Sequence, residues 1–521
     1  MTDLPSGWAM TRLSEISAIN PRVDKSAFEP DTVVSFVAMP AVEAETGKID
    51  VSETRTFAQV KQGYTPFRKG DVLFAKITPC MENGKMAIVP EMVSDHGFGS
   101  TEFHVLRPAQ GVDPKYIYHA VSNQGFRYHA EHNMTGAVGQ KRVPASVLED
   151  HELGLPPSNE QRRIVEKIEA MFDEIDKGVE SLHTARTTLG LYRQSLLKSA
   201  FEGRLTADWR ALNADKLEAP EPLLARIQRE RDTRYKTALD AWQEALTTWR
   251  ADGEKGKKPA KPKRATDVAP LEERELKELP ALPDAWAFSR LGLYIDWIEA
   301  GKSFKCLETE PRPNQVGVAK VSAVSWGEYD ETESKTCLDE DKINEEWFIH
   351  KGDFLLSRAN TIELVGASVI AKTVTKRIML SDKTLRIHFA PEDRRFFLHY
   401  LRSPYGRAEI EVRSTGNQES MRNIGQDRIK SIIIPLCSEN EQAEIVQILD
   451  ARLDAAARLE AEIDAALTRA DALRQSILKK AFSGQLVSQD PDDEPAPTLL
   501  ARIKADRAKS PKPKKRRTAH A

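Results

Sequence analysis

Four short segments of the chain concentrate side chains that can recognise nucleic-acid bases. They read AKITPCMENGK at 75–85, TGAVGQKRV at 135–143, SRANT at 357–361 and STGNQESMRNI at 414–424. Lys and Arg pair with O6 and N7 of guanine or neutralise phosphates, whereas Asn and Gln pair with N6 and N7 of adenine. The candidate DNA-contacting residues are Lys76, Thr78, Asn83, Lys85, Gln140, Lys141, Arg142, Arg358, Asn360, Asn417, Gln418, Arg422 and Asn423.

Each candidate taken alone could equally belong to a polar turn with solvated charges. As a set the candidates favour DNA, because the last two segments carry comparable donors at points that match the first two. The formal net charge of −3 means that any such role must come from local basic surface. The Lys/Pro-rich runs at 255–264 and 509–517 fit solvated linkers at least as well as contacts with DNA or an acidic partner.

Catalytic and metal-binding patterns are missing from the sequence. AGKS at 300–303 resembles the end of a phosphate-binding loop, but Asp296 stands where the first glycine of that motif is required. No G-x-G-x-x-G, adenine-methyltransferase, nuclease or H-E-x-x-H pattern is present, and the four scattered cysteines form no zinc pair. The sequence therefore predicts a chain without catalytic residues, metal or cofactor of its own.

The location expected for the chain is the cytoplasm. Scattered cysteines suit a reducing compartment. No apolar run reaches the roughly 18–20 residues that span a bilayer, and the first residues lack the apolar region of a signal peptide. We therefore expect no membrane partner.

Most sequence motifs of the chain occur twice, in the same order. RQSLLKSAFEGRL at 193–205 returns as RQSILKKAFSGQL at 474–486, and KGDVLFAK at 69–76 returns as KGDFLLSR at 351–358. LPSGW at 4–8 likewise returns as LPDAW at 282–286, TG at 135–136 returns at 415–416, and LLARI at 223–227 recurs at 499–503. Two copies are too few and too large for a solenoid, so the duplication favours a pseudo-two-fold molecule.

The elements expected from residue patterns divide the chain into six segments. Short β-like runs between turn residues, such as those at 103–108 and 385–390, predict mixed α/β domains, and 113–130 predicts one helix within the first of them. The segments are an α/β domain at 1–157, a long helix at 158–205, a charged helical connector with a Lys/Pro-rich linker at 206–280, a second α/β domain at 281–437, a second long helix at 438–486, and a short helix with a basic disordered tail at 487–521.

Both long helices carry an apolar residue at every seventh position, which is typical of a coiled coil. The seam residues are Ile168, Ile175, Leu182, Leu189 and Leu196 in the first helix, and Leu449, Ala456, Ile463, Ala470 and Ile477 in the second. Met171, Ala185, Tyr192, Leu459 and Leu473 are among those predicted for the intermediate positions. Each helix would be roughly 60 Å long. A two-fold axis between them would require an antiparallel pair; alternatively, each helix packs on its own domain.

Taken together, these motifs resemble the specificity subunit of Type I restriction–modification systems. The resemblance rests on LPSGW and LPDAW, the KGD strands, the TG loops, the helix entries PPSNEQ at 156–161 and PLCSENEQ at 435–442, and the shared helix ends. It implies a mixed α+β fold: two α/β target recognition domains in tandem, joined by two long helices that form an antiparallel coiled coil with pseudo-two-fold symmetry. Each domain would read one half of a bipartite, asymmetric DNA site.

The same resemblance implies the partners of the chain. They would be double-stranded DNA, two modification (methyltransferase) subunits that use S-adenosylmethionine to methylate adenine, and two restriction subunits that use ATP and Mg²⁺ to translocate and cleave DNA. The chain itself would not be catalytic. The alternatives are a duplicated coiled-coil scaffold that binds proteins without DNA, and a free-standing DNA-modifying enzyme with degenerate motifs. The base sequence recognised depends on loop geometry that the residues do not fix.

Overall fold

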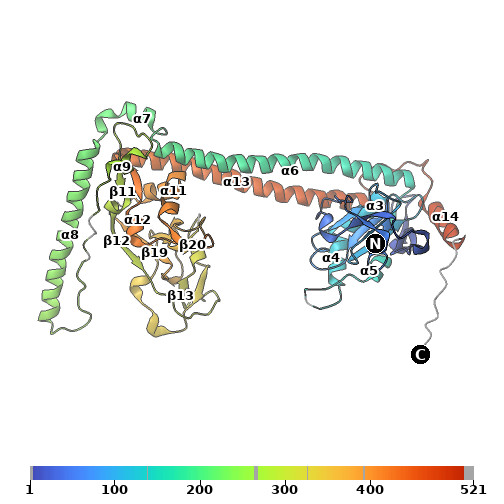
Figure 1. Cartoon of the computed structure of the whole chain (residues 1–521), viewed down its shortest axis with the longest axis horizontal. Coiled ribbons are helices and arrows are strands. Elements are labelled where there is room, and N and C mark those ends of the chain that lie inside the picture. Colours follow the sequence, from blue (N-terminus) through green and yellow to red (C-terminus); the bar gives the residue numbers. More distant parts are fainter. Residues whose placement is uncertain are drawn as a thin grey trace. The chain divides into compact units, whose positions relative to one another are not determined.

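The computed structural model describes residues 4–137, 139–262, 264, 268–325, 327–390 and 393–509 (Figure 1). Their contacts divide the chain into two compact units. Unit 1 runs to Thr184 and resumes at Ile463, and unit 2 is Ala185–Glu462. The division cuts both long helices, so each unit holds one α/β domain with a part of each helix. The division into six segments stays a prediction, and its basic tail from 510 onward lies outside the described residues.

The α/β part of unit 1 contains two four-stranded sheets. One is antiparallel with the order β2-β9-β6-β7, and the other has the order β4-β3-β8-β5, in which β3 and β8 are parallel. Its strands are β1 (Ala9–Arg12), β2 (Ser17–Ile19), β3 (Val33–Val37), β4 (Thr54–Thr56), β5 (Thr65–Arg68), β6 (Val72–Ala75), β7 (Met86–Ile88), β8 (His96–Gly99), β9 (Phe103–Pro108) and β10 (Glu152–Leu155). Its helices are α1 (Leu13–Ile16), η1 (Lys25–Ala27), η2 (Met39–Ala41), α2 (Phe57–Val60), α3 (Pro114–Ser122), α4 (Gln124–His132) and α5 (Ala145–Glu149).

Unit 2 repeats this topology with one strand fewer in its second sheet and with an added small sheet of the order β16-β21-β20. An antiparallel sheet has the order β12-β19-β15-β17, and a second sheet has the order β14-β13-β18, with β13 and β18 parallel. The strands are β11 (Ala287–Arg290), β12 (Ile295–Ala300), β13 (Val316–Ala319), β14 (Ser334–Thr336), β15 (Phe354–Ser357), β16 (Ala359–Asn360), β17 (Ser368–Ile370), β18 (Arg377–Met379), β19 (Thr384–Phe389), β20 (Thr415–Gln418), β21 (Met421–Asn423) and β22 (Ile433–Leu436). The helices outside the long pair are α7 (Ala207–Leu212), η3 (Ala214–Lys216), α8 (Pro220–Ala251), α9 (Glu273–Lys277), η4 (Leu291–Tyr294), η5 (Val321–Ala323), η6 (Glu340–Lys342), η7 (Glu345–Trp347), α10 (Arg395–Arg402), α11 (Pro404–Arg413) and α12 (Gln426–Lys430).

Most of the element types expected from the sequence are confirmed, with one clear correction. Strands β9 and β19 lie where runs at 103–108 and 385–390 predicted them. The single helix predicted over 113–130 is wrong, because α3 ends and α4 begins at Asn123. The Asn123 side chain accepts a hydrogen bond from Gly125 N at 2.8 Å and caps α4.

The repeated Lys-Gly-Asp motif places a buried ion pair between the central strands of each antiparallel sheet. Asp71, just before β6, accepts hydrogen bonds from the Arg107 guanidinium on β9 at 2.7 and 2.8 Å. Asp353, just before β15, accepts one from Arg386 on β19 at 2.8 Å. Removing one partner of such a pair would leave a buried charge unpaired, so the aspartate of the motif is a structural requirement of both copies.

The long helices α6 (Ser158–Phe201) and α13 (Glu439–Phe482) have 44 residues each. In unit 1 the start of α6, with Ile168, shares a core with the end of α13, with Ile477. In unit 2 the end of α6, with Leu196, shares a core with the start of α13, with Leu449. Within each unit the two helices therefore run antiparallel.

The predicted seven-residue seam lies on the inner face of these helices. Ile168, Leu196, Leu449, Ala456, Ile463 and Ile477 are buried, and Ile175, Leu182, Leu189 and Ala470 are half-buried. Four of the predicted intermediate residues are wrong, since Ala185, Tyr192, Leu459 and Leu473 are exposed. The second seam position instead follows four residues after the first and is occupied by half-buried Phe172, Val179, Leu453 and Leu467. Polar pairs interrupt the seam: Arg193 contacts Glu460 at 2.7 Å in unit 2, and Arg474 pairs with Asp176 in unit 1.

A tryptophan fastens each α/β domain to its long helix. Trp8 Nε1 donates a hydrogen bond to Glu160 Oε1 at 3.0 Å, and Trp286 Nε1 donates one to Glu441 Oε2 at 2.8 Å. Both carboxylates are buried in the first turn of a long helix. In unit 2, Arg210 Nε also donates to Glu441 at 2.8 Å. In each unit, the tryptophan of the LPSGW or LPDAW motif therefore contacts the entry of the long helix.

The repeated LLARI sequence forms equivalent helices in the two units. In unit 1 it lies in α14 (Ala496–Lys509), where Leu499 and Ile503 are buried against the α/β domain. In unit 2 it opens α8, where Leu223 and Ile227 are buried in the corresponding core. Helix α14 contacts α1, and α8 contacts η4, which follows the first strand of its domain as α1 does.

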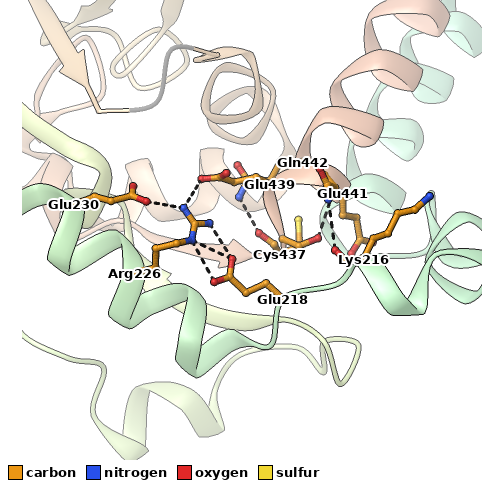
Figure 2. A network of polar contacts seen from close by, with 10 residues as sticks. Lys216, Glu218, Arg226, Glu230, Cys437, Glu439, Glu441 and Gln442 are labelled. Carbon is orange, nitrogen blue, oxygen red and sulfur yellow. Dashed lines mark hydrogen bonds and ion pairs between the residues drawn. The ribbon is translucent and has the colours of Figure 1, made fainter.

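Arg226 ties the start of α8 to the entry of α13 (Figure 2). Its guanidinium contacts the carboxylates of Glu218 and Glu230 at 2.9 Å and that of Glu439 at 3.2 Å. Hydrogen bonds to these carboxylates raise the pKa of Arg226 above its ordinary value. The first turns of α8 therefore belong to the structural core of unit 2.

A buried histidine makes unit 1 sensitive to acid. His119 on α3 is 5% exposed, and burial, with a smaller contribution from Lys115, lowers its pKa to about 4. The unfolded chain binds the proton near pH 6.5, so stability falls as pH drops from about 6.5 toward 4, by at most about 3 kcal/mol. His119→Gln should flatten this part of the stability profile in chemical denaturation, whereas His129→Gln, at an exposed position, should not. Equal profiles for His119→Gln and the unmodified chain would contradict the assignment.

Candidate DNA interface

In unit 1 the two predicted loops meet at the end of β6. Thr78 N donates to Lys141 O at 3.0 Å, and Val143 N donates to Lys76 O at 2.8 Å. Arg142 also forms backbone bridges with Ile77 and with Thr135. Segments 75–85 and 135–143 therefore form one continuous surface, although residues 86–134 separate them in the chain.

In unit 2 the corresponding segments meet at the end of β15. Strand β16 pairs with β21, with Ala359 opposite Asn423 and Asn360 opposite Arg422. Strand β21 pairs in turn with β20, which makes a short exposed hairpin (Figure 1). The same two segments are joined in each copy, so the duplication preserves the arrangement of the loops.

The repeated Thr-Gly dipeptide has a structural reason at this junction. Gly136 and Gly416 have φ angles of 122° and 137°, which only glycine adopts readily. A Cβ on Gly416 would lie 2.3 Å from Met421 O, and one on Gly136 would lie 3.0 Å from Gln140 O. Each glycine lets the returning chain approach closely, which sets the position of the donors that follow.

The candidate residues separate into two groups by exposure. The exposed group, available to a ligand, is Asn83, Gln140, Lys141, Asn417 and Gln418. The other candidates, Lys76, Thr78, Lys85, Arg142, Arg358, Asn360, Arg422 and Asn423, are half-buried. The exposed group comes from loops and from strand β20, and the half-buried group from the strands and turns that support them.

Several half-buried candidates are engaged inside their own domain in unit 1. Arg142 forms two hydrogen bonds of 2.9 Å to Glu102, and this pairing lowers the pKa of the Glu102 carboxyl. Lys85 Nζ donates to Val42 O at 2.9 Å, and Thr78 Oγ1 donates to Glu82 at 2.9 Å. These side chains shape the loops, and a DNA contact from them would compete with these bonds.

Unit 2 shows the same division of roles with different residues. Arg422 donates to Ser414 O at 3.0 Å and to Gly416 O at 2.9 Å, which closes the base of the hairpin. Arg358 Nε donates to Asn423 Oδ1 at 3.3 Å, and Asn360 Oδ1 accepts from Thr361 N at 2.9 Å. In unit 2 exposed Lys383 occupies the position of Glu102, because Arg358 N donates to Lys383 O as Lys76 N donates to Glu102 O. That position therefore offers no carboxylate to an arginine.

A third segment, which was not predicted from the sequence, joins this surface in unit 2. The AGKS turn lies beside 381–383, since Gly301 N donates to Ser381 O at 3.2 Å and Ser303 pairs with Asp382. A Cβ on Gly301 would lie only 1.9 Å from Leu380 O, so that glycine serves close packing. The turn carries exposed Lys302 and Lys305, and the adjacent segment 381–383 contacts the Arg358 segment, since Arg358 N donates to Lys383 O at 2.8 Å. Their position becomes apparent only when β12 and β19 pair.

Two classes of site are not found among the described residues. No group of three or more His, Cys, Asp or Glu side chains there is arranged to hold a metal ion. Within the same residues, no helix combines the length and apolar character needed to cross a membrane.

Comparisons with known proteins agree with this organisation. The model of the Type I restriction modification DNA specificity domain matches residues 5–181 and 286–469. The EcoEI specificity subunit of a Type I restriction enzyme from Escherichia coli is 29% identical, over 91% of this chain and 83% of its own length. The EcoKI specificity subunit from Escherichia coli K12 is 23% identical over 97% of both chains.

The fold is also shared with a solved structure. A chain from a structure on complex assembly and conformational transition of the type I R-M system is 21% identical, with a TM-score of 0.63, over 93% of this chain and all of that one. At that identity the likeness concerns the fold alone. The family match covers both α/β domains and much of both long helices. The chain therefore belongs to the Type I restriction modification DNA specificity family.

Proposed function

We propose that the joined loops of each unit read one half of a bipartite DNA site for a Type I restriction–modification complex. As a member of its family, the chain is the specificity subunit, the part of such an enzyme that recognises DNA and is not itself catalytic. One observation carries the assignment of the reading surface. Both units join the same two loop segments in the same way, at the end of β6 and at the end of β15, but present different side chains there.

The exposed donors are the best candidates for base contacts. In unit 1 these are Asn83, Gln140 and Lys141, and in unit 2 they are Asn417 and Gln418. Amide side chains favour adenine and lysine favours guanine or phosphate. Arg142 and Arg422 are held by Glu102 and by the hairpin backbone, so we assign them to the support of the loops. The two surfaces differ in residues, which supports an asymmetric site.

The paired long helices are proposed to set the gap between the half-sites. A helix of 44 residues is about 66 Å long at 1.5 Å per residue, and its antiparallel partner stiffens it. Two readers on such a support can engage major-groove segments about one helical turn of DNA apart. The scaffold without DNA binding, considered from the sequence, has no support from the family match.

The partners of the specificity subunit are DNA and the other subunits of the restriction–modification complex. Their number is part of the proposal: two modification subunits and two restriction subunits, matching the two copies in this chain. We further propose that S-adenosylmethionine, ATP and Mg²⁺ act on those subunits. The role of this chain is then to bring methylation to one adenine in each half-site.

Substitution at the exposed donors tests the reading surface. Gln140→Ala with Lys141→Ala should weaken binding to the cognate site by about 10- to 100-fold and relax the preference in one half-site. The complex with modification subunits would be titrated with cognate and half-site-altered duplexes. Lys69→Ala is the matched control, since Lys69 is exposed and precedes β6 at the end remote from the loops. Equal losses in the control, or none in the loop variant, would contradict the assignment.

A further inference from the structure

Helix α8 extends beyond the core of unit 2 with one aromatic face. Tyr235, Trp242 and Trp249 are spaced by seven residues and are half-buried, and Leu246 on the same face is buried. Only the first turns of α8, with Leu223 and Ile227, belong to the core of the α/β domain. Figure 1 shows the later turns with the returning chain beside them. Around Trp242 and Trp249 the aromatic face is therefore covered by something other than the α/β domain.

The Lys/Pro-rich run after α8 is what covers it. Trp249 Nε1 donates a hydrogen bond to Gly256 O at 3.3 Å, and Trp242 Nε1 donates one to Pro259 O at 3.1 Å. The two acceptors are three residues apart, and the two donors are seven apart. Three residues of an extended Pro-rich segment span about 9 Å, and seven residues of α-helix span about 10.5 Å, so the two repeats match.

The cationic side chains that lie over the aromatic rings are also spaced by three residues along the run. Lys258 lies over the Trp249 ring at 6.0 Å from its centroid, and Lys261 lies over the Trp242 ring at 5.8 Å. Arg264 lies over Tyr235 at 6.0 Å. Cation–π contacts of this kind favour one position for each charge. The described part of this run, which the composition suggested to be a solvated linker, therefore lies along α8 with its charges exposed.

The arm formed by α8 and the described residues of 255–264 is strongly basic along the extended segment that follows the helix. The run from 255 to 264 contains six Lys or Arg and no Asp or Glu. Lys255, Lys258, Lys261 and Arg264 are exposed, and Lys257, also exposed, pairs with Glu346. Because the aromatic face is already covered, this row of charge is the main feature the arm offers to a partner.

We propose that this arm binds the phosphate backbone of DNA outside the half-site read by unit 2, without sequence preference. The inference rests on the proposed function, because it needs DNA held by the loops of unit 2. Within unit 2, α8 lies against β12, with Arg234 at 3.6 Å from Asp296, whereas the reading hairpin is β20–β21. Figure 1 shows that hairpin on the other side of the domain from α8. Contacts of the arm therefore fall on flanking DNA, where Lys and Arg release counterions from phosphates.

The test uses the full chain in complex with its modification subunits. Lys258→Gln with Lys261→Gln should weaken binding by about tenfold near 0.1 M salt and reduce the slope of log affinity against log salt by about 2. The methylated motif should stay unchanged. Trimming the flanking DNA on the unit 2 side should remove the difference between the variant and the unmodified complex.

Two control variants are needed for this test. Lys258→Arg with Lys261→Arg should keep the original slope, and Lys351→Gln with Lys372→Gln, at exposed lysines elsewhere in unit 2, should also keep it. An unchanged slope in the Gln variant would overturn the proposal. Weaker assembly with a protein subunit at unchanged DNA affinity would overturn it in favour of an acidic protein surface. If the unmodified complex produced no gapped methylation motif, the proposed function itself would be refuted. The failure of the proposed function can therefore be distinguished from the failure of the arm proposal.

Discussion

Replacing residues 4–157 with the matching domain of another family member should change one half of the methylated sequence and preserve the other half. The loops that join at the end of β6 all lie within this segment, so the reading surface moves as a whole. The replacement should keep a tryptophan at the position of Trp8, because Glu160 lies outside the segment and is buried. A foreign domain without this donor would leave that carboxylate without its hydrogen bond, which costs roughly 1–3 kcal/mol.

The reciprocal exchange is the control for this prediction. Replacing 286–436 should change only the other half, with the Trp286–Glu441 contact retained. Motifs would be mapped by sequencing methylated adenines in cells that carry the modification subunit. A change in both halves after either exchange would contradict the independence of the two readers.

Lengthening both long helices by one heptad should widen the gap between half-sites. Seven residues add about 10.5 Å, which corresponds to about three base pairs, and they keep the seam in register. The insertions belong after residue 181 in α6 and after residue 469 in α13. These two positions face each other, as interpolated between the antiparallel contacts Asp176–Arg474 in unit 1 and Arg193–Glu460 in unit 2.

Single insertions provide the control for the helix experiment. A heptad in α6 alone leaves its seam without a partner, so we expect loss of methylation and a lower unfolding temperature. The doubly extended chain should retain methylation at the new gap. Methylation by the doubly extended chain at the original gap would refute the proposed role of the helices as a spacer.

The sequence predicted the location of the reading loops better than the roles of individual side chains. The loops were identifiable because Gly136 and Arg142 recur as Gly416 and Arg422 at one offset, with other polar donors nearby in each copy. The pairing of Arg142 with Glu102 could not be predicted, because the two residues are 40 positions apart and meet only in the folded sheet. The same holds for Lys302 and Lys305, which reach the surface through a turn that resembled a phosphate-binding motif.

The contacts between the two long helices were also predicted only in part. The seven-residue repeat located the seam, but repeat spacing alone did not distinguish a second seam position three residues on from one four residues on. Leu459 and Leu473 are therefore exposed, although their apolar character suggested burial. The docking of the Lys/Pro-rich run on α8 could not be predicted for another reason. It requires the spacing of Trp242 and Trp249 along the helix to match the spacing of carbonyl groups along an extended chain.

The central claim is that two unlike readers in one chain each recognise their own half of a gapped DNA word. Genome-wide mapping of methylated adenines, with the chain expressed beside its modification subunit, tests it most directly. The account predicts one motif of two unlike parts separated by a fixed unspecified gap, lost when this chain is deleted. One uninterrupted methylated word, or marks that persist without the chain, would contradict it.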